Sequence, residues 1–195
     1  MTVIKDGAGT GYAAKVDSLN RLHTTAVTET AWNYALREGR AYSISTGVIA
    51  LTSANESALI YISFNEALGV VLEETVITTG ASTGGTGDVL TNAYIAPTTG
   101  TVISDATLGS ALNLNQSSSS ELDVTVYTGA EGKTLSGETL TVPGITNTSF
   151  INRPGKGAFL TKGASFGTSV FPPVGNTSMS VVITYYFYVP EVTRL

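Results

Sequence analysis

The chain has 195 residues and a net charge of −5, and its 30 Thr, 19 Ser and 21 Gly fill more than a third of it, while charged residues make up only 13%. This length suits one domain with a hydrophobic core, and the composition is typical of strands and turns, not of a helical bundle. A hydrophobic content of 42% excludes a disordered chain, and the absence of an apolar run near the roughly 20 residues that span a bilayer excludes a membrane-inserted protein. A sequence pI of 4.8 argues against a non-specific nucleic-acid binder.

The chain has no cysteine and one histidine, His23. Disulfides, structural zinc, thiol catalysis and sites built on two histidines are therefore excluded. The first residues contain no apolar stretch of signal-peptide length, so we expect no Sec export. No loop has the spacing of an EF-hand, and we expect neither a metal nor a cofactor.

Residues 1–40 predict an extended N-terminal arm and linker. Residues 1–25 contain closely spaced glycines and no sustained period of 3.6 or 2, so this segment has no face to bury by itself. The window Glu29–Glu38 has the one helix-like pattern, although Trp32 and Tyr34 would also suit a strand.

From residue 41 to residue 195 the pattern is repetitively β. Glycine, proline and serine turns separate the runs, which favours a sandwich or barrel, and we predict a single jelly-roll-like β-sandwich. The runs are Ala41–Ser53, Ala58–Phe64, Val70–Thr79, Val89–Ala96, Thr101–Ser104, Leu122–Thr128, Thr139–Val142 and Ser178–Val189.

The last of these runs is apolar on both faces. This pattern predicts either a central strand or a strand partly buried against another copy of the chain. For the second case, the candidate oligomer-interface residues are Tyr185 and Phe187.

Charge is unevenly distributed along the chain. Residues 41–132 contain nine acids and no Lys or Arg, whereas residues 1–40 have a net charge of +1 and residues 133–195 of +3. Such asymmetry suggests surfaces that face different surroundings, unless the two ends fold beside the middle and neutralise it.

None of the motifs that suggest phosphate binding or catalysis has the full residue pattern that such a function needs. Gly80–Asp88 (GASTGGTGD) is rich in glycine, but an acid stands where a phosphate-binding loop needs Lys, so we expect a flexible β-connection. Glu73 and Glu74 are adjacent and would point to opposite faces of a strand, and Glu121 and Asp123 fit a solvated strand face. For His23, a hydrogen-bonding or interface role is favoured over catalysis. We therefore expect no enzyme.

Several strings resemble a group of virion structural proteins from tailed bacteriophages, especially phages of marine bacteria. The resemblance covers most of the chain and departs from the group's pattern over residues 25–45 and 143–165. Its most specific part is the arm, IKDGAGTGYAAKVDSLNRLHT (Ile4–Thr24). The others are GASTGGTGDV (Gly80–Val89), APTTGTVISDAT (Ala96–Thr107), GAEGKTLS (Gly129–Ser136) and FPPVGNTSMSVVI (Phe171–Ile183).

The resemblance implies a non-enzymatic protein, made in the host cytoplasm and carried in many copies on the capsid exterior. Among virion roles we favour a decoration (cement) protein. Its expected partner is the major capsid protein, bound through the arm, and a homotrimer is the preferred oligomer. The long acidic segment would suit an outward face. The alternatives are a connector, collar or tail component, or a carbohydrate-binding module at the host-facing surface. The arm residues expected to bind the capsid are Ile4, Lys5, Tyr12, Lys15, Val16, Arg21, Leu22 and His23.

Overall fold

The computed structural model describes residues 15–16, 22–23, 30–104, 107–144, 149–152 and 158–191. The chain divides into two compact units, Met1–Thr30 and Ala31–Leu195. In the first unit, strands β1 (Lys15–Val16) and β2 (Leu22–His23) form a short antiparallel pair.

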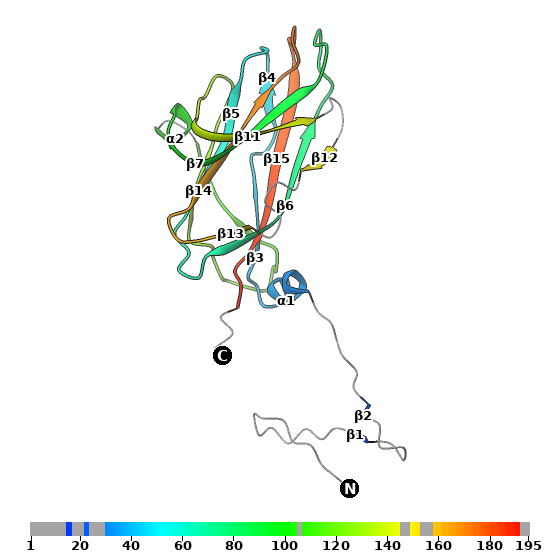
Figure 1. Ribbon diagram of the computed structural model, residues 1–195, viewed down its shortest axis with the longest axis vertical. Helices are drawn as coiled ribbons and strands as arrows, with labels where there is room; N and C mark the ends of the chain where they lie inside the picture. The colour runs from blue at the N-terminus through cyan, green and yellow to red at the C-terminus, as the bar shows by residue number, and fades with distance from the viewer. Residues whose placement is uncertain are drawn as a thin grey trace. The chain divides into compact units, whose positions relative to one another are not determined.

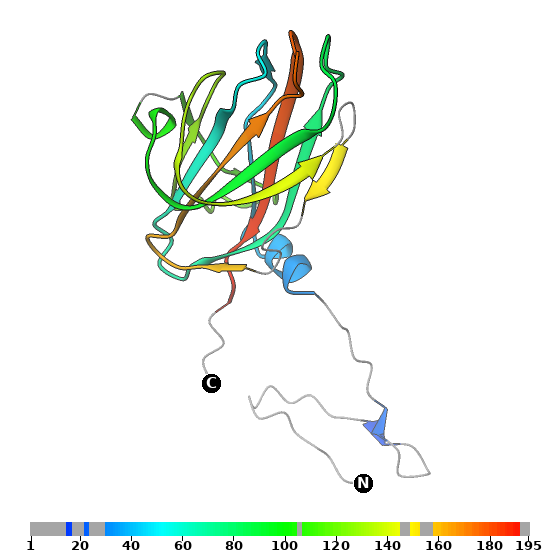
Figure 2. The ribbon, with the colours of Figure 1, turned by 45° about the horizontal axis from the view of Figure 1, so that its top comes forward.

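The second unit is an all-β sandwich, as the sequence predicts (Figures 1 and 2), and all its paired strands in the described part are antiparallel. The jelly-roll order of connections stays a prediction. The first sheet, called the β5 sheet, has the order β11 (Ser136–Gly144), β7 (Val89–Thr99), β14 (Ser165–Phe171), β5 (Ser57–Phe64), β10 (Val124–Thr128) and β8 (Thr107–Gly109).

The second sheet, called the β15 sheet, has β15 at its centre. Its order is β12 (Ser149–Asn152), β6 (Val70–Thr79), β15 (Met179–Tyr188), β3 (Ala41–Ser45) and β9 (Leu112–Asn113), with β13 (Ala158–Leu160) also on β6 and β4 (Ile49–Leu51) also on β15.

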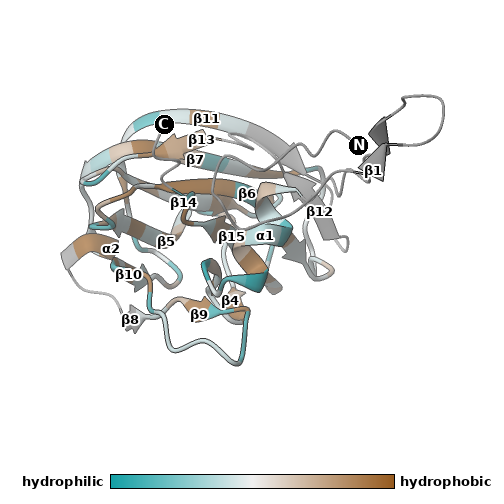
Figure 3. Cartoon of the chain, turned by 90° about the horizontal axis from the view of Figure 1, so that it is seen from below, coloured by the Kyte–Doolittle hydropathy of each residue, from teal (hydrophilic) through white to brown (hydrophobic). Residues whose placement is uncertain are grey.

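The main core lies between the two sheets and consists of alternate residues of their strands. Period-two alternation sends every second side chain inward, and the inward residues here are aliphatic and aromatic. Seen from the α1 end, brown apolar segments mark β13 and β14 (Figure 3). Fully buried members are Ile44, Leu51, Leu59, Ile60, Ile62, Phe64, Val70, Val89, Val170, Val181, Ile183 and Phe187.

The central position of β15 decides between the two interpretations of its apolar run. Tyr185 and Phe187 are only 3% and 0% exposed, and both pack in the chain's own core. Ring contacts join them to Phe64 and Phe166 of the opposite sheet. The assignment of these two residues to an oligomer interface is therefore wrong, because no second copy can reach them.

A smaller apolar cluster lies on the outer face of the β5 sheet. It contains Ala58, Tyr94, Val102 and Leu135. Val102 belongs to α2 (Thr101–Ser104), a single helical turn where the sequence predicts a strand. The β-branched residues of this segment favour a strand locally, but burial of Val102 against the sheet outweighs that preference.

Helix α1 (Ala31–Arg37) packs on the sandwich, so the domain begins at residue 31 and not at residue 41. Ala35 is buried, and the Trp32 ring meets the rings of Tyr186 and Tyr188 edge-on at 6.3 and 6.2 Å. The guanidinium groups of Arg37 and Arg40 lie over the Tyr34 ring, at 5.0 and 5.4 Å from its centre.

At the other end of the sandwich, the segment Gly80–Asp88 is held to the loop before β15. Thr83 pairs with Ser178, and Thr86 pairs with Val174, as isolated antiparallel bridges. The buried Asn176 accepts a hydrogen bond from Ser82 Oγ and donates from Nδ2 to the carbonyls of Leu51 and Ser53. The expected β-connection is therefore anchored to two neighbouring loops.

Candidate functional site

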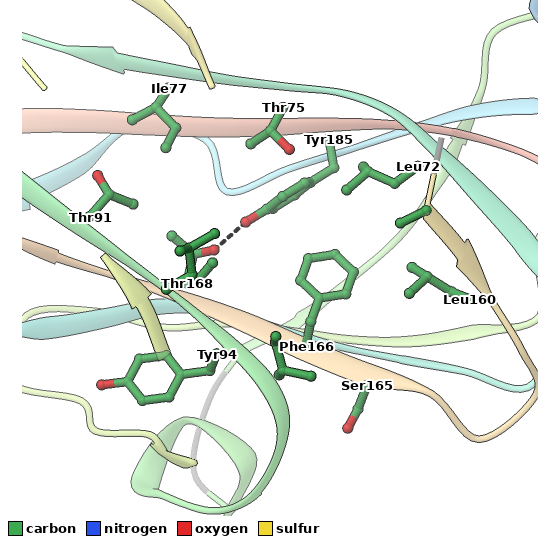
Figure 4. A pocket seen from close by; sticks show the side chains of 14 residues that line it. Leu72, Thr75, Ile77, Thr91, Tyr94, Leu160, Ser165, Phe166, Thr168 and Tyr185 are labelled. Carbon is green, nitrogen blue, oxygen red and sulfur yellow. Dashed lines mark hydrogen bonds between the residues drawn. The ribbon is translucent and has the colours of Figure 1, made fainter. Parts of the chain in front are cut away.

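A cavity of about 250 Å³ lies between the two sheets, and we call it the inter-sheet cavity. Strands β6, β13 and β15 supply one wall, and β7, β11 and β14 supply the other (Figure 4). The lining is mainly apolar, because inward positions of these strands carry the residues Leu72, Ile77, Ala93, Leu160 and Phe166.

Two hydroxyl groups in this cavity satisfy each other. Thr168 Oγ1 on β14 and the Tyr185 hydroxyl on β15 share a hydrogen bond that crosses between the sheets (Figure 4). Burial raises the pKa of Tyr185 well above its ordinary value of 10.0. The phenol therefore remains neutral near pH 7.

A third hydroxyl has no partner. Thr91 on β7 is 2% exposed and lines the cavity, and its Oγ1 is the buried side-chain polar atom of the described residues that lacks a hydrogen bond. Buried polar groups in folded proteins are nearly always paired, so a hydroxyl of this kind points to a missing partner.

The cavity reaches solvent along an apolar rim. Ile95 on β7 and Leu140 on β11 both line it, yet they are 61% and 49% exposed. A molecule would therefore meet two aliphatic side chains at the entrance.

A second depression lies on the outer face of the β15 sheet, and we call it the Trp32 hollow. It is lined by Trp32, Glu73, Glu74, Val76 and Tyr186. The two glutamates share this face because the β6–β15 register shifts between Tyr186 and Phe187, leaving an extra residue on β6. Burial, followed by the charge of Glu73, raises the pKa of the nearby Tyr188.

The prediction that Glu73 and Glu74 point to opposite faces is therefore wrong. Period-two alternation holds only within a regular ladder, and the bulge interrupts it. Both residues are half-buried on the outer side of β6, while Leu72 and Thr75 on either side of them are buried.

Glu56 binds donors from two neighbouring strands. Its Oε1 accepts hydrogen bonds from Asn92 Nδ2 at 3.0 Å, from the Tyr94 hydroxyl at 2.7 Å and from Ser169 Oγ. Burial, and then the bond to Glu56, raises the pKa of Tyr94. This carboxylate therefore joins the start of β5 to β7 and β14.

Glu131 has a comparable role in a loop. Its carboxylate accepts hydrogen bonds from the backbone N–H groups of Thr52 and Ser53 and from Thr52 Oγ1, each at 2.7 Å. The bonds from Thr52 are the main reason that the pKa of Glu131 is lowered.

The expected capsid-binding residues belong to the first unit. Lys15 and Val16 form β1 and pair with His23 and Leu22 of β2. The other four expected residues lie outside the described residues, namely Ile4, Lys5, Tyr12 and Arg21.

Sequence reasoning missed the cavity and two of its polar lining residues, Thr91 and Thr168. Thr91 stands in the predicted run Val89–Ala96, where threonine is an ordinary strand former, and Thr168 lies in β14, which is not among the predicted runs, so composition carries no signal for either residue. Only the register that places β7 beside β14 shows that they share one interior.

No protein-family model matches the chain, and no curated protein matches it significantly. Within the described ranges, no helix has the length and apolar character to cross a membrane. The same residues contain no group of three or more His, Cys, Asp or Glu side chains placed to hold a metal ion.

Proposed function

We propose that the chain is a non-enzymatic structural protein of a phage particle and decorates the outer surface of the major capsid protein shell. The observation that carries this proposal is the division of the chain into a sandwich with its own core and a separate unit, Met1–Thr30. We infer that this first unit binds a neighbouring protein. The resemblance of Ile4–Thr24 to virion proteins supports the same role.

Two acids that each accept three hydrogen bonds fit this role. Glu56 and Glu131 bind donors on neighbouring strands and loops of their own domain. Such bonds rigidify the sandwich and leave the carboxylates engaged, which suits a protein that bears load and transforms no substrate.

Stabilisation would come from added interface between shell subunits. Ordering the arm against the shell buries apolar side chains, and the cations Lys5, Lys15 and Arg21 pair with shell acids. A trimer on a three-fold position of the shell would multiply the affinity of one arm.

Quantitative mass spectrometry of purified virions tests the position of the protein. A decoration protein will be present in a fixed ratio to the major capsid protein and will bind saturably to shells that lack it. A copy number that matches a single ring would instead assign it to a connector, collar or tail, and absence from virions would overturn the proposal.

The Trp32 hollow favours one second candidate, a carbohydrate-binding module. Aromatic rings beside carboxylates suit a sugar, because its C–H faces pack on rings and its hydroxyls donate to carboxylates. A glycan array with the wild-type protein and a Trp32→Ala variant tests this candidate. It requires a glycan bound by the wild type and lost in the variant.

A further inference from the structure

The inter-sheet cavity has the properties of a built binding site. Its walls come from the interiors of two paired sheets, so its shape exists before any ligand arrives. At about 250 Å³ it exceeds the roughly 150 Å³ of an apolar cavity that accepts benzene. The apolar rim at Ile95 and Leu140 provides an entrance.

The chemistry of the lining restricts what fits. None of the described lining residues is charged, so an ionic ligand would lose its hydration without gaining a counter-charge. Because most of the wall is aliphatic or aromatic, the body of the ligand must be apolar as well.

The unpaired Thr91 hydroxyl supplies the remaining requirement. It is buried at the cavity wall without a hydrogen bond, whereas the neighbouring Thr168 hydroxyl is satisfied by Tyr185. Because this oxygen has almost no exposed surface, a ligand's hydroxyl or carbonyl group reaches it only after Thr91 rotates about χ1, and the new hydrogen bond would then remove the cost of leaving that hydroxyl unpaired.

We propose that the inter-sheet cavity binds a neutral, largely apolar small molecule whose single hydroxyl or carbonyl group hydrogen-bonds to Thr91. The Thr168–Tyr185 hydrogen bond joins the two walls and holds the two sheets together at this point. Binding by the free protein requires no particle, so this proposal is independent of the virion role.

The test compares p-cresol with toluene, which have nearly the same size and differ by one hydroxyl group. Both are titrated into the full-length protein, with binding followed by NMR shifts of the amides of β7 and β14. We expect both to bind, and p-cresol to bind roughly fivefold more tightly, the factor expected of one neutral hydrogen bond. Benzoate, of similar size but charged, is expected not to bind.

Two variants locate the site. Thr91→Val keeps the side-chain shape and removes the hydroxyl, so toluene should bind as before while the advantage of p-cresol disappears. Ala93→Leu fills the cavity and should abolish binding of both.

The proposal is wrong if p-cresol binds the wild type no better than toluene, because the ligand would then form no hydrogen bond with the Thr91 hydroxyl. It is equally wrong if benzoate binds as well as p-cresol. Binding that both variants leave unchanged would place these ligands elsewhere and also overturn it. Unfolding curves of each variant verify that it is folded before titration.

Discussion

One oxygen of Glu56 accepts three hydrogen bonds, so removing this side chain leaves three donor groups without their acceptor. In Glu56→Ala, the buried side chains of Asn92, Tyr94 and Ser169 lose their acceptor. We expect the free energy of unfolding to fall by roughly 2–4 kcal/mol, measured by urea denaturation. Glu56→Gln, which keeps one acceptor oxygen, should lose less.

The exposed Glu138 on β11 is the matched control for this prediction. Glu138→Ala should change the free energy of unfolding by no more than about 0.5 kcal/mol. Equal losses in the Glu56 and Glu138 alanine variants would show that the Glu56 bonds contribute nothing particular to stability.

Tyr185 makes stability depend on alkaline pH. Burial raises its pKa in the folded protein above 10.0, so below pH 10 both states hold the proton and pH has no effect through this group. Above pH 10 the unfolded chain releases the proton first, and the free energy of unfolding falls as pH rises. Denaturant melts from pH 9 to 11 should show this fall.

Two variants separate ionisation of Tyr185 from its hydrogen bond. Tyr185→Phe should flatten part of the alkaline loss, the remainder coming from tyrosines such as Tyr42 and Tyr94, whose pKa is also raised. Thr168→Val removes the same hydrogen bond but keeps the phenol, so its alkaline loss should persist. Identical pH profiles for Tyr185→Phe and the wild type would contradict the assignment.

At the scale of single residues, the sequence predicts which side chains point inward better than it predicts what they pack against. The alternation in Ala58–Phe64 predicts that Ile60, Ile62 and Phe64 share one face, and all three are buried in the main core, but Leu59 of the other face is buried there too, beside a register shift in the β5–β14 ladder. Tyr185 and Phe187 are buried too, but a pattern of apolar residues does not tell whether the chain's own sheet or a second copy covers them.

At the scale of elements, the failures occur where tertiary contacts override local preference. The bulge in β6 turns Glu73 and Glu74 to one face, and no residue type in Val70–Thr79 predicts this shift in register. The turn α2 has a clearer cause, because it follows Gly100 and buries Val102 against β5.

Gly100 supplies the next prediction. Its φ of 143° favours glycine, and a Cβ there would lie 2.3 Å from the Thr134 carbonyl oxygen. Gly132 also has a positive φ, 75°, but open space around its Cβ position. In thermal or urea unfolding, Gly132→Ala should cost about 1 kcal/mol and Gly100→Ala roughly 2–4 kcal/mol. Equal costs would mean that the close approach relaxes freely.

At the scale of the whole molecule, charge in the sequence does not translate into one charged face. Residues 41–132 supply strands to both sheets, β5, β7 and β10 to one and β3, β6 and β9 to the other. The charge of this acidic segment therefore does not indicate a single outward surface. Segment charge predicts a face only where the segment stays in one layer of the fold.

The division at residue 30 yields the last prediction, in which two truncations are compared. A chain of residues 31–195 keeps α1, with the buried Ala35 and the Trp32 contacts to Tyr186 and Tyr188. Its melting temperature should stay within about 3 °C of the full-length value. A chain of residues 41–195 lacks α1 and should melt several degrees lower, since burial of those groups is lost.

Particle binding separates attachment from folding in the same pair. If the first unit attaches the protein to its shell, the chain of residues 31–195 will be folded but will not bind undecorated particles. Salt will weaken binding by the full-length chain only in part, because apolar contacts persist when charges are screened. Sedimentation with particles measures both. Full binding by residues 31–195 would place the attachment surface on the sandwich, and unfolding of that truncated chain would show that the first unit belongs to the stable core.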